Sequence, residues 1–235
     1  MKRKENDIDC IKCQNMATSA FCNLKPSELQ LLNQYKTTND VKRKQPVFYE
    51  NDAVKGLHCV HEGKVKLFKT LNDGSIQILR IAKAGDLLGY RGLLGNGKYI
   101  ATAETIEDST ICFIPKGRIF EFIASNLQFS LGLMSKIASD LSEVENRAIN
   151  FLQKTSKERL SEALLLLEHS FGTTADGFIN ILLTREEIAG FTGMAVETTI
   201  RTLHTWENEG LVTLHKKHIK LSDKIKLLEI SNIEE

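Results

Sequence analysis

The segment from Leu127 to Thr155 is the part of this sequence that most restricts the fold. It contains no proline and a single glycine, Gly132. Its apolar residues recur in alternating steps of three and four, which is the spacing of a coiled-coil seam. We expect one long helix that pairs with a second copy of the chain, although a helix packed on its own domain is the alternative. The expected seam consists of Met134, Ile137, Leu141, Val144, Ala148 and Phe151.

A different pattern precedes this helix, from Val41 to about Pro115. Short runs of alternating apolar residues are separated by glycine-containing turns, which predicts many short strands and an all-β roll or barrel. Pro26 opens a short helical pattern before the first strand, and helical signals resume near Lys116. The clearest strand runs are Val47–Tyr49, His58–Val60, Val65–Phe68, Ile76–Ile81 and Thr110–Ile114.

Length and charge set limits on the whole chain. A chain of 235 residues suggests two compact units. With 31 Lys and Arg against 30 Asp and Glu, the net charge of +1 is only a weak argument for a nucleic-acid partner. No apolar run approaches the ~20 residues that cross a bilayer, and the charged start lacks the apolar region of a signal peptide. We expect a cytoplasmic protein with no membrane partner.

The region after Ser156 carries a two-helix motif. A helix with Leu160 and Leu167 on its apolar face is followed by a glycine-rich loop and an expected strand over Phe178–Leu183. Thr184 and Glu187 then form a capping box, and Gly193 supplies a turn before a second helix that stops at Gly210. Two helices joined by such a turn are typical of a DNA-binding helix-turn-helix.

The second helix is amphipathic in a way that suits base reading. Val196, Thr199, Leu203 and Trp206 form its expected buried face. On the other face, Arg201 can bind guanine through two hydrogen bonds, Glu197 can accept from cytosine, and Ile200 can contact a thymine methyl. An exposed Glu197–Arg201 ion pair is the plainer alternative. The expected DNA contacts, including a basic wing, are Thr184, Arg185, Glu197, Ile200, Arg201, His204, Lys216 and Lys217.

These motifs resemble the CRP/FNR superfamily of bacterial transcription regulators. The similarity is clearest over Leu183–Leu211, with Val196-Glu197-Thr198 leading to Arg201, and it extends to Glu62–Val65 and Ala84–Gly89 in the strand-rich region. Ala195 departs from the Ser or Thr that often caps the family's second helix. The resemblance implies an α+β fold, with an N-terminal β-roll like that of cyclic-nucleotide-binding domains, a long dimerisation helix and a C-terminal winged helix-turn-helix.

The resemblance also implies domains and partners. We expect a cysteine segment and β-roll sensor over 1–126, the dimerisation helix over 127–155, and the DNA-binding domain over 156–235. The implied partners are double-stranded DNA bound at a palindromic operator, a second copy of the chain, and RNA polymerase. The sequence shows no Walker loop, no dinucleotide-binding GxGxxG and no catalytic triad, so we do not expect an enzyme.

The effector loop departs from that of the cyclic-nucleotide-binding members. Those members have Gly-Glu before the loop and Arg followed by Ser or Thr after it. Here Tyr90 follows Gly89 in place of the acid, and no such Arg pair follows. We therefore do not expect cAMP binding, but another small ligand remains an alternative, in a pocket formed by Gly89, Tyr90, Arg91, Lys98 and Tyr99.

The cysteines suggest a different signal. Cys10, Cys13 and Cys22, with Cys112 far along the chain, resemble the ligands of the FNR branch, which hold a [4Fe-4S] cluster that can respond to oxygen. A closed zinc site would use the same four thiolates, and a chain without metal is the third alternative. Cys59 lies in an apolar strand run, where we expect it to be a core residue.

Overall fold

The computed structural model describes residues 8–232. Residues 1–7, the start of the expected sensor domain, and residues 233–235, the end of the expected DNA-binding domain, lie outside the described residues. The chain divides into two compact units. The first comprises the residues up to 69 together with 79–142, and the second comprises 70–78 together with the residues from 143 onward. Each unit is described by itself.

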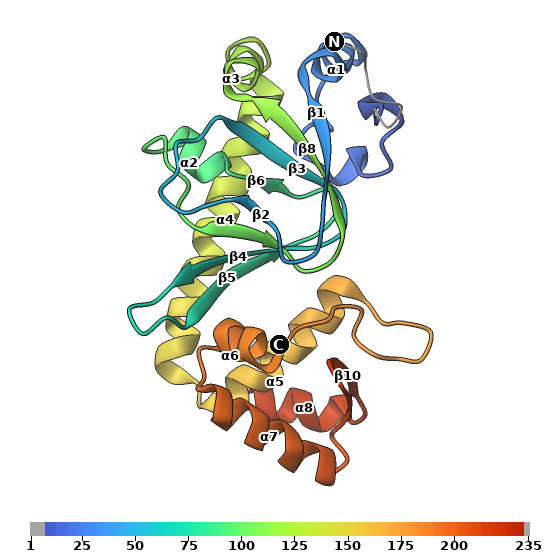
Figure 1. Cartoon of the computed structure of the whole chain (residues 1–235), viewed down its shortest axis with the longest axis vertical. Helices are drawn as coiled ribbons and strands as arrows, with labels where there is room; N and C mark the ends of the chain where they lie inside the picture. The colour runs from blue at the N-terminus through green and yellow to red at the C-terminus, as the bar shows by residue number, and fades with distance from the viewer. Residues whose placement is uncertain (1–7, 233–235) are drawn as a thin grey trace. The chain divides into compact units, whose positions relative to one another are not determined.

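Eight short strands form the β-roll expected from the glycine-broken runs (Figure 1). They make two four-stranded sheets, of order β1-β8-β3-β6 and β2-β7-β4-β5. Both faces of β3 and β8 carry buried residues, with Leu57 and Ile114 on one face and Val60 and Ile111 on the other. The strands are β1 Thr37–Val41, β2 Pro46–Phe48, β3 Gly56–Glu62, β4 Val65–Thr70, β5 Ile76–Ala82, β6 Leu87–Leu88, β7 Thr102–Thr105 and β8 Ser109–Pro115.

Short helices surround the sheet that contains β3 and β8. Helices α1 (Pro26–Tyr35) and α3 (Lys116–Ser125) both contact β8. Two short 3-10 turns, η1 (Cys10–Lys12) and η2 (Met16–Thr18), precede α1, and the short helix α2 (Tyr90–Leu94) follows β6. Apolar residues from these helices join the strands in one core, which includes Leu32, Leu57, Ile114, Ile119 and Phe122.

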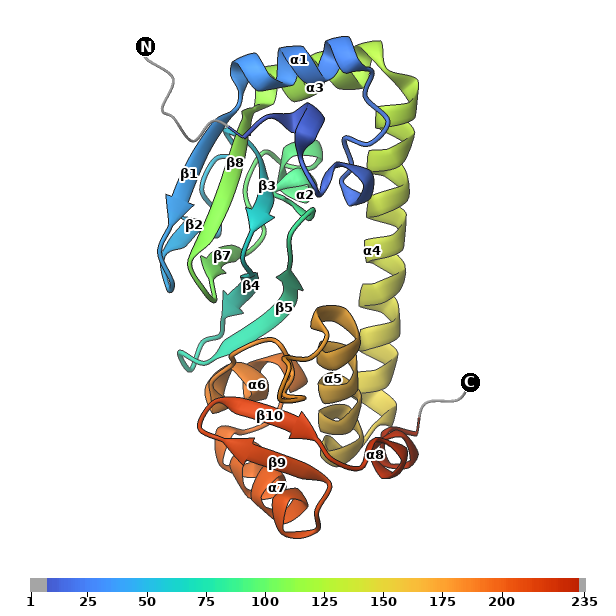
Figure 2. The same cartoon turned by 90° about the vertical axis from the view of Figure 1, so that its right-hand side faces the viewer.

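The long helix expected from the seam pattern is confirmed as α4, Leu127–Gln153 (Figure 2). Asn126 caps its start, because its side-chain oxygen accepts a hydrogen bond from the Phe129 amide at 3.0 Å. Phe129 and Leu133 of this helix belong to the core of the first unit, and Ser130 and Asp140 are buried polar residues of the same helix.

The second unit is a winged helix-turn-helix. Its core contains Leu160, Leu164, Leu203, Trp206 and Leu227. The last helix, α8, which the sequence pattern did not predict, packs on this core through Leu227. Asp223 caps the start of α8, because its carboxylate accepts a hydrogen bond from the Lys226 amide at 3.0 Å. The elements are α5 Ser156–Phe171, α6 Arg185–Thr192, α7 Val196–Asn208, β9 Val212–His215, β10 His218–Leu221 and α8 Lys224–Ser231.

The strand expected over Phe178–Leu183 is not formed, and that prediction was wrong. Only an isolated bridge joins Thr173 to Ile179. Burial still alternates along this segment, since the side chains of Ile179, Ile181 and Leu183 are buried. A backbone hydrogen bond to β10 runs from the Ile179 amide to the Ile219 carbonyl at 2.8 Å. Burial of alternate side chains therefore produced the strand-like pattern without a ladder of hydrogen bonds.

Candidate nucleic-acid interface

The start of α6 is fixed by the capping box expected from the sequence. The Thr184 hydroxyl accepts from the Glu187 amide at 3.1 Å, and the Glu187 carboxylate accepts from the Thr184 amide at 2.8 Å. Gly193 ends the helix in the left-handed conformation, with φ 64° and ψ 37°. Because L side chains rarely adopt this conformation, glycine is the residue that permits the tight turn into α7.

Helix α7 presents a polar outer face. Its buried residues are Thr199, Thr202, Leu203 and Trp206, so Thr202 takes the place that the sequence analysis gave to Val196, which is only partly buried. Glu197, Arg201 and His204 are exposed, and Ile200 retains 37% of its surface. The last turn is held by Glu207, which accepts from the Leu214 amide of β9 at 3.1 Å. Ala195 gives no side-chain cap at the start.

The wing is the hairpin of β9 and β10, with Lys216 and Lys217 exposed at its tip. Arg185, at the start of α6, reaches this tip, because its Nη2 donates to the Lys216 carbonyl at 3.3 Å. Burial lowers the pKa of Arg185, while Glu207 and Glu186 act in the opposite direction. Its Nη1 is buried and has no hydrogen-bond partner among the described residues. Arg185 therefore positions the wing and keeps an unused donor beside it.

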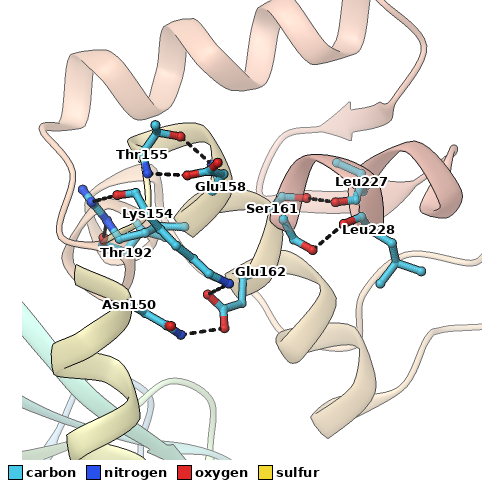
Figure 3. A network of polar contacts seen from close by, with 11 residues as sticks. Asn150, Lys154, Thr155, Glu158, Ser161, Glu162, Thr192, Leu227 and Leu228 are labelled. Atoms are coloured by element: carbon cyan, nitrogen blue, oxygen red, sulfur yellow. Dashed lines mark hydrogen bonds and ion pairs between the residues drawn. The ribbon is translucent and has the colours of Figure 1, made fainter. Parts of the chain in front are cut away.

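The junction between α4 and α5 is held by a polar network (Figure 3). Glu162 of α5 accepts hydrogen bonds from Asn150 at 2.9 Å and from Lys154 at 3.1 Å. Thr155 and Glu158 form a second capping box at the start of α5. Arg159 joins the Lys154 carbonyl, at 2.8 Å, to the Thr192 carbonyl at the end of α6, at 3.1 Å. The end of α4 is thereby connected to the helix-turn-helix.

Aromatic contacts make the same connection. The ring of Phe151 lies against the Gly193 turn, where an added Cβ would approach it to 2.0 Å. The Arg159 guanidinium lies 4.8 Å from the centre of that ring, and the Arg147 guanidinium lies 5.3 Å from the Phe191 ring of α6. These contacts join the last turns of α4 to α6 and to the turn before α7.

The expected seam residues of α4 are mostly exposed in the single chain. Met134 retains 63% of its surface, Leu141 57% and Val144 47%. Ala148 is exposed, while Ile137 is partly buried. Phe151 retains 45%, but part of its ring is used in the contact with Gly193. Five of the six residues thus leave substantial apolar surface for a partner.

The residues of the expected effector pocket are split between the core and the surface. Tyr90 and Tyr99 are buried, whereas Arg91 and Lys98 are exposed. The Tyr90 hydroxyl donates to the Asp140 carboxylate of α4 and accepts from Arg80 at 3.2 Å. The Tyr99 hydroxyl lies 3.2 Å from His58 Nε2. The two tyrosines therefore meet internal partners where a ligand was expected.

The cysteines are not arranged as the sequence suggested. Cys22 is exposed, whereas Cys10 and Cys112 are buried and Cys13 and Cys59 are partly so. Burial raises the pKa of Cys10 to about 12, with Lys36 lowering it and the thiols of Cys112 and Cys13 raising it. Within residues 8–232, no group of three His, Cys, Asp or Glu side chains is placed to hold a metal ion. The expected ligand set therefore fits neither a closed zinc site nor a cluster as it stands.

Two family models match the chain. The model of the cyclic nucleotide-binding domain matches residues 38–126, and the model of the Crp-like helix-turn-helix domain matches residues 158–230. Together they cover the β-roll and the winged helix-turn-helix described above. In the part of the chain that the structure describes, no helix is both long and apolar enough to cross a membrane.

Similar curated proteins and solved structures agree with these models. Regulatory protein HlyX of Actinobacillus pleuropneumoniae is 24% identical over 90% of both chains. The fumarate and nitrate reduction regulatory protein of Escherichia coli is also 24% identical, over 98% of this chain and 94% of its own. FixK2 from Bradyrhizobium japonicum has the same fold, with a TM-score of 0.75 and 21% identity over 85% of this chain and 99% of its own. A CRP/FNR family regulator from Thermus thermophilus, with a TM-score of 0.72 and 22% identity over 84% and 99%, shares it too. With both family models matched in order and full-length relatives that are regulators, this chain is a DNA-binding transcription regulator of the CRP/FNR superfamily.

Proposed function

We propose that the chain acts in the cytoplasm as a homodimer that reads a palindromic operator with α7 and transmits a signal from its N-terminal domain. The observation that carries this proposal is the outer face of α7, where Glu197, Ile200 and Arg201 are exposed together beside a basic wing. An exposed isoleucine between two charged residues gains little from water, but it suits contact with a thymine methyl.

The homodimer is supported by α4. Met134, Leu141 and Val144 are exposed at coiled-coil spacing on a helix of 27 residues. Two such helices would bury these side chains against each other. A two-fold dimer presents two copies of α7, and the operator should repeat its half-site with the opposite orientation.

Transmission of the signal depends on the two ends of α4. The first part of the helix contributes Asp140 to the contact with Tyr90 in the β-roll. The last part contributes Phe151 to the contact with the Gly193 turn. A shift of α4 caused in the N-terminal domain would therefore change the position of α7, and binding of the signal and of DNA would be coupled in both directions.

Redox state is the signal that we favour, by similarity to the FNR branch. A thiolate-bound iron–sulfur cluster, when present, can change its type and charge on contact with oxygen. The ligand set expected from the sequence does not fit, because Cys22 is exposed. A small ligand at the Gly89–Tyr99 loop is the second candidate, and the exposed Arg91 and Lys98 favour an anion there. RNA polymerase is a proposed partner by similarity to the family.

The test of this proposal is a fluorescence anisotropy titration of a palindromic duplex and of a scrambled duplex of equal length, each at several salt concentrations. We expect tighter binding of the palindrome at every salt concentration, with two chains per duplex. Equal affinity for the two duplexes with the same salt dependence would indicate contact with phosphates alone and would contradict base reading by α7.

A further inference from the structure

Helix α6 carries a glycine at a position where no side chain fits. Gly190 lies four residues after Glu186 and therefore on the same face of the helix. Glu186 is exposed, whereas Gly190 is buried. A Cβ built at Gly190 would lie 2.4 Å from the Ile76 carbonyl oxygen and 3.3 Å from a carbon of the Ile76 side chain. Another segment of the chain therefore covers this face of α6 at close range.

The covering segment is the turn between β4 and β5. Residues 71–75 of the turn are exposed, whereas Ile76 and Gln77, the first two residues of β5, are half-buried. The Gln77 side-chain amide donates a hydrogen bond to the Gly190 carbonyl at 2.7 Å. Residues 70–78 belong to the same compact unit as the winged helix-turn-helix. The contact is therefore internal to the DNA-binding unit.

This contact accounts for the glycine in α6. Glycine is less favourable than alanine inside a helix, and Gly190 is not among the glycines with a positive φ. The close approach of Ile76 gives the reason for a residue without a side chain. The Gly190 carbonyl is also one of the last four of α6, which lack a partner within a helix. Gln77 supplies the missing donor.

The strand that carries Gln77 also holds the loop of Tyr90. Arg80, three residues further along β5, donates to the Tyr90 hydroxyl at 3.2 Å and to the Leu87 carbonyl at 2.8 Å. Side chains three apart on a strand point to opposite faces. One face of β5 thus contacts the Tyr90 loop through Arg80, and the other contacts α6 through Gln77.

We propose that the tip of the β4–β5 hairpin is a functional part of the DNA-binding unit, in which Ile76 and Gln77 position α6 and thereby α7. The proposal rests on the proposed transmission of a signal, because it makes β5 a second connection, besides α4, between the Tyr90 loop and the helix-turn-helix. While the contact holds, α6 is ordered before DNA binds. Without it, part of the binding free energy must order the motif, and the affinity for DNA falls.

Two single variants test the contact in the palindrome titration with full-length protein. Gln77→Met keeps a similar length but has no amide donor, and we expect it to weaken binding about three- to tenfold. Gly190→Ala should weaken binding at least as much. Gly117→Ala, near the start of α3 with open space around it, is the matched control and should bind as the natural chain does. Circular dichroism establishes that each variant is folded, and Gln77→Met suffices if Gly190→Ala is not.

The double variant distinguishes positioning through this contact from a general loss of structure. If Gln77 and Gly190 act through one contact, Gln77→Met should weaken binding no further in a chain that already carries Gly190→Ala. Fully additive losses would overturn the proposal, because the two residues would then act independently. Binding equal to that of the natural chain in both single variants would overturn it as well.

Hydrogen–deuterium exchange without DNA gives a readout that does not depend on the operator. We expect faster exchange at the backbone amides of residues 71–78 and of α6 in Gly190→Ala and Gln77→Met than in the natural chain or Gly117→Ala. Unchanged exchange in both variants would overturn the contact. A natural chain without preference for the palindrome would contradict the proposed function instead, and the exchange rates would still decide whether the hairpin holds α6.

Discussion

The Phe151 ring, two residues before the end of α4, lies directly against Gly193, the left-handed residue of the turn between α6 and α7. The contact joins the helix proposed to form the dimer to the motif proposed to read DNA. Both residues belong to the second unit. A side chain at Gly193 would therefore meet two obstacles, its own backbone conformation and the Phe151 ring.

Replacement of Gly193 by alanine should destabilise the helix-turn-helix more than a backbone effect alone. We expect about 1–2 kcal/mol from the left-handed conformation and about 1–3 kcal/mol from crowding of Phe151. Urea unfolding measures the loss. Gly210→Ala is the matched control, because Gly210 also has a positive φ, of 75°, but open space around it.

A double-mutant cycle isolates the contact itself. If crowding of Phe151 contributes, the pair Gly193→Ala and Phe151→Ala should be more stable than the sum of the two single effects predicts. Strict additivity would show that the Gly193 effect comes from its backbone alone.

The hydrogen bond from Tyr90 to Asp140 should make the stability of the β-roll depend on pH. Burial acts to raise the pKa of the Asp140 carboxyl, but hydrogen bonds from Lys136 and Tyr90 outweigh it and hold the pKa below its ordinary value of 3.8. A lowered carboxyl pKa stabilises the fold above its ordinary value, and that stabilisation is lost as pH falls through the lowered one. Acid unfolding should therefore be shallower in Asp140→Asn than in the natural chain.

Removal of the Tyr90 hydroxyl tests the same bond at neutral pH. Tyr90→Phe should cost about 1–2 kcal/mol, toward the low end for a bond to a charged group because Lys136 stays bound to Asp140 at 2.8 Å. Thermal unfolding followed by circular dichroism measures it. Tyr49→Phe, at a residue that is 57% exposed, is the control and should leave the unfolding temperature unchanged. Equal losses in the two variants would contradict a stabilising hydrogen bond from Tyr90 to Asp140.

A charge in the seam of α4 should dissociate the dimer. Leu141→Glu or Val144→Glu would place carboxylates in an apolar interface, where desolvation costs several kcal/mol. We expect sedimentation velocity to show a monomer that still has its helical signal. Ser142→Glu, at an exposed position of α4 outside the seam, is the control and should remain dimeric.

A DNA-binding assay should distinguish a residue that contacts bases from a residue that contacts phosphates. Arg201→Ala should cost about 1–3 kcal/mol at one base pair of each half-site, and Lys217→Ala should weaken all duplexes alike and reduce the salt slope by about 1 per subunit. If Lys217→Ala changed sequence preference while Arg201→Ala did not, the roles assigned to the wing and to α7 would be reversed.

The sequence was sufficient for elements that depend on local periodicity. The three-four spacing from Met134 to Phe151 predicted α4, and Thr184 with Glu187 predicted the capping box of α6. Glycine-broken alternation predicted the roll. The same alternation misled at Phe178–Leu183, because alternate burial does not require a hydrogen-bonded neighbour strand.

Site residues could be predicted from the sequence only where they all lie on one helix or strand. The exposed face of α7 follows from helical spacing alone. By contrast, the partnership of Tyr90 with Asp140 joins residues 50 apart in the sequence, and the contact of Gln77 with Gly190 joins residues 113 apart. Cysteine spacing pointed to Cys22 because spacing does not record that Cys22 is exposed while Phe21 and Leu24 beside it are buried.

The most direct test of the central claim is selection of bound duplexes from a random DNA pool by the full-length protein, repeated with Arg201→Ala. We predict enrichment of a two-fold repeat whose half-site centres lie about 34 Å apart, one turn of DNA. In the variant, preference should be lost at one symmetric pair of positions. Enrichment of no sequence, or of the same repeat with every position unchanged in Arg201→Ala, would contradict base reading by α7.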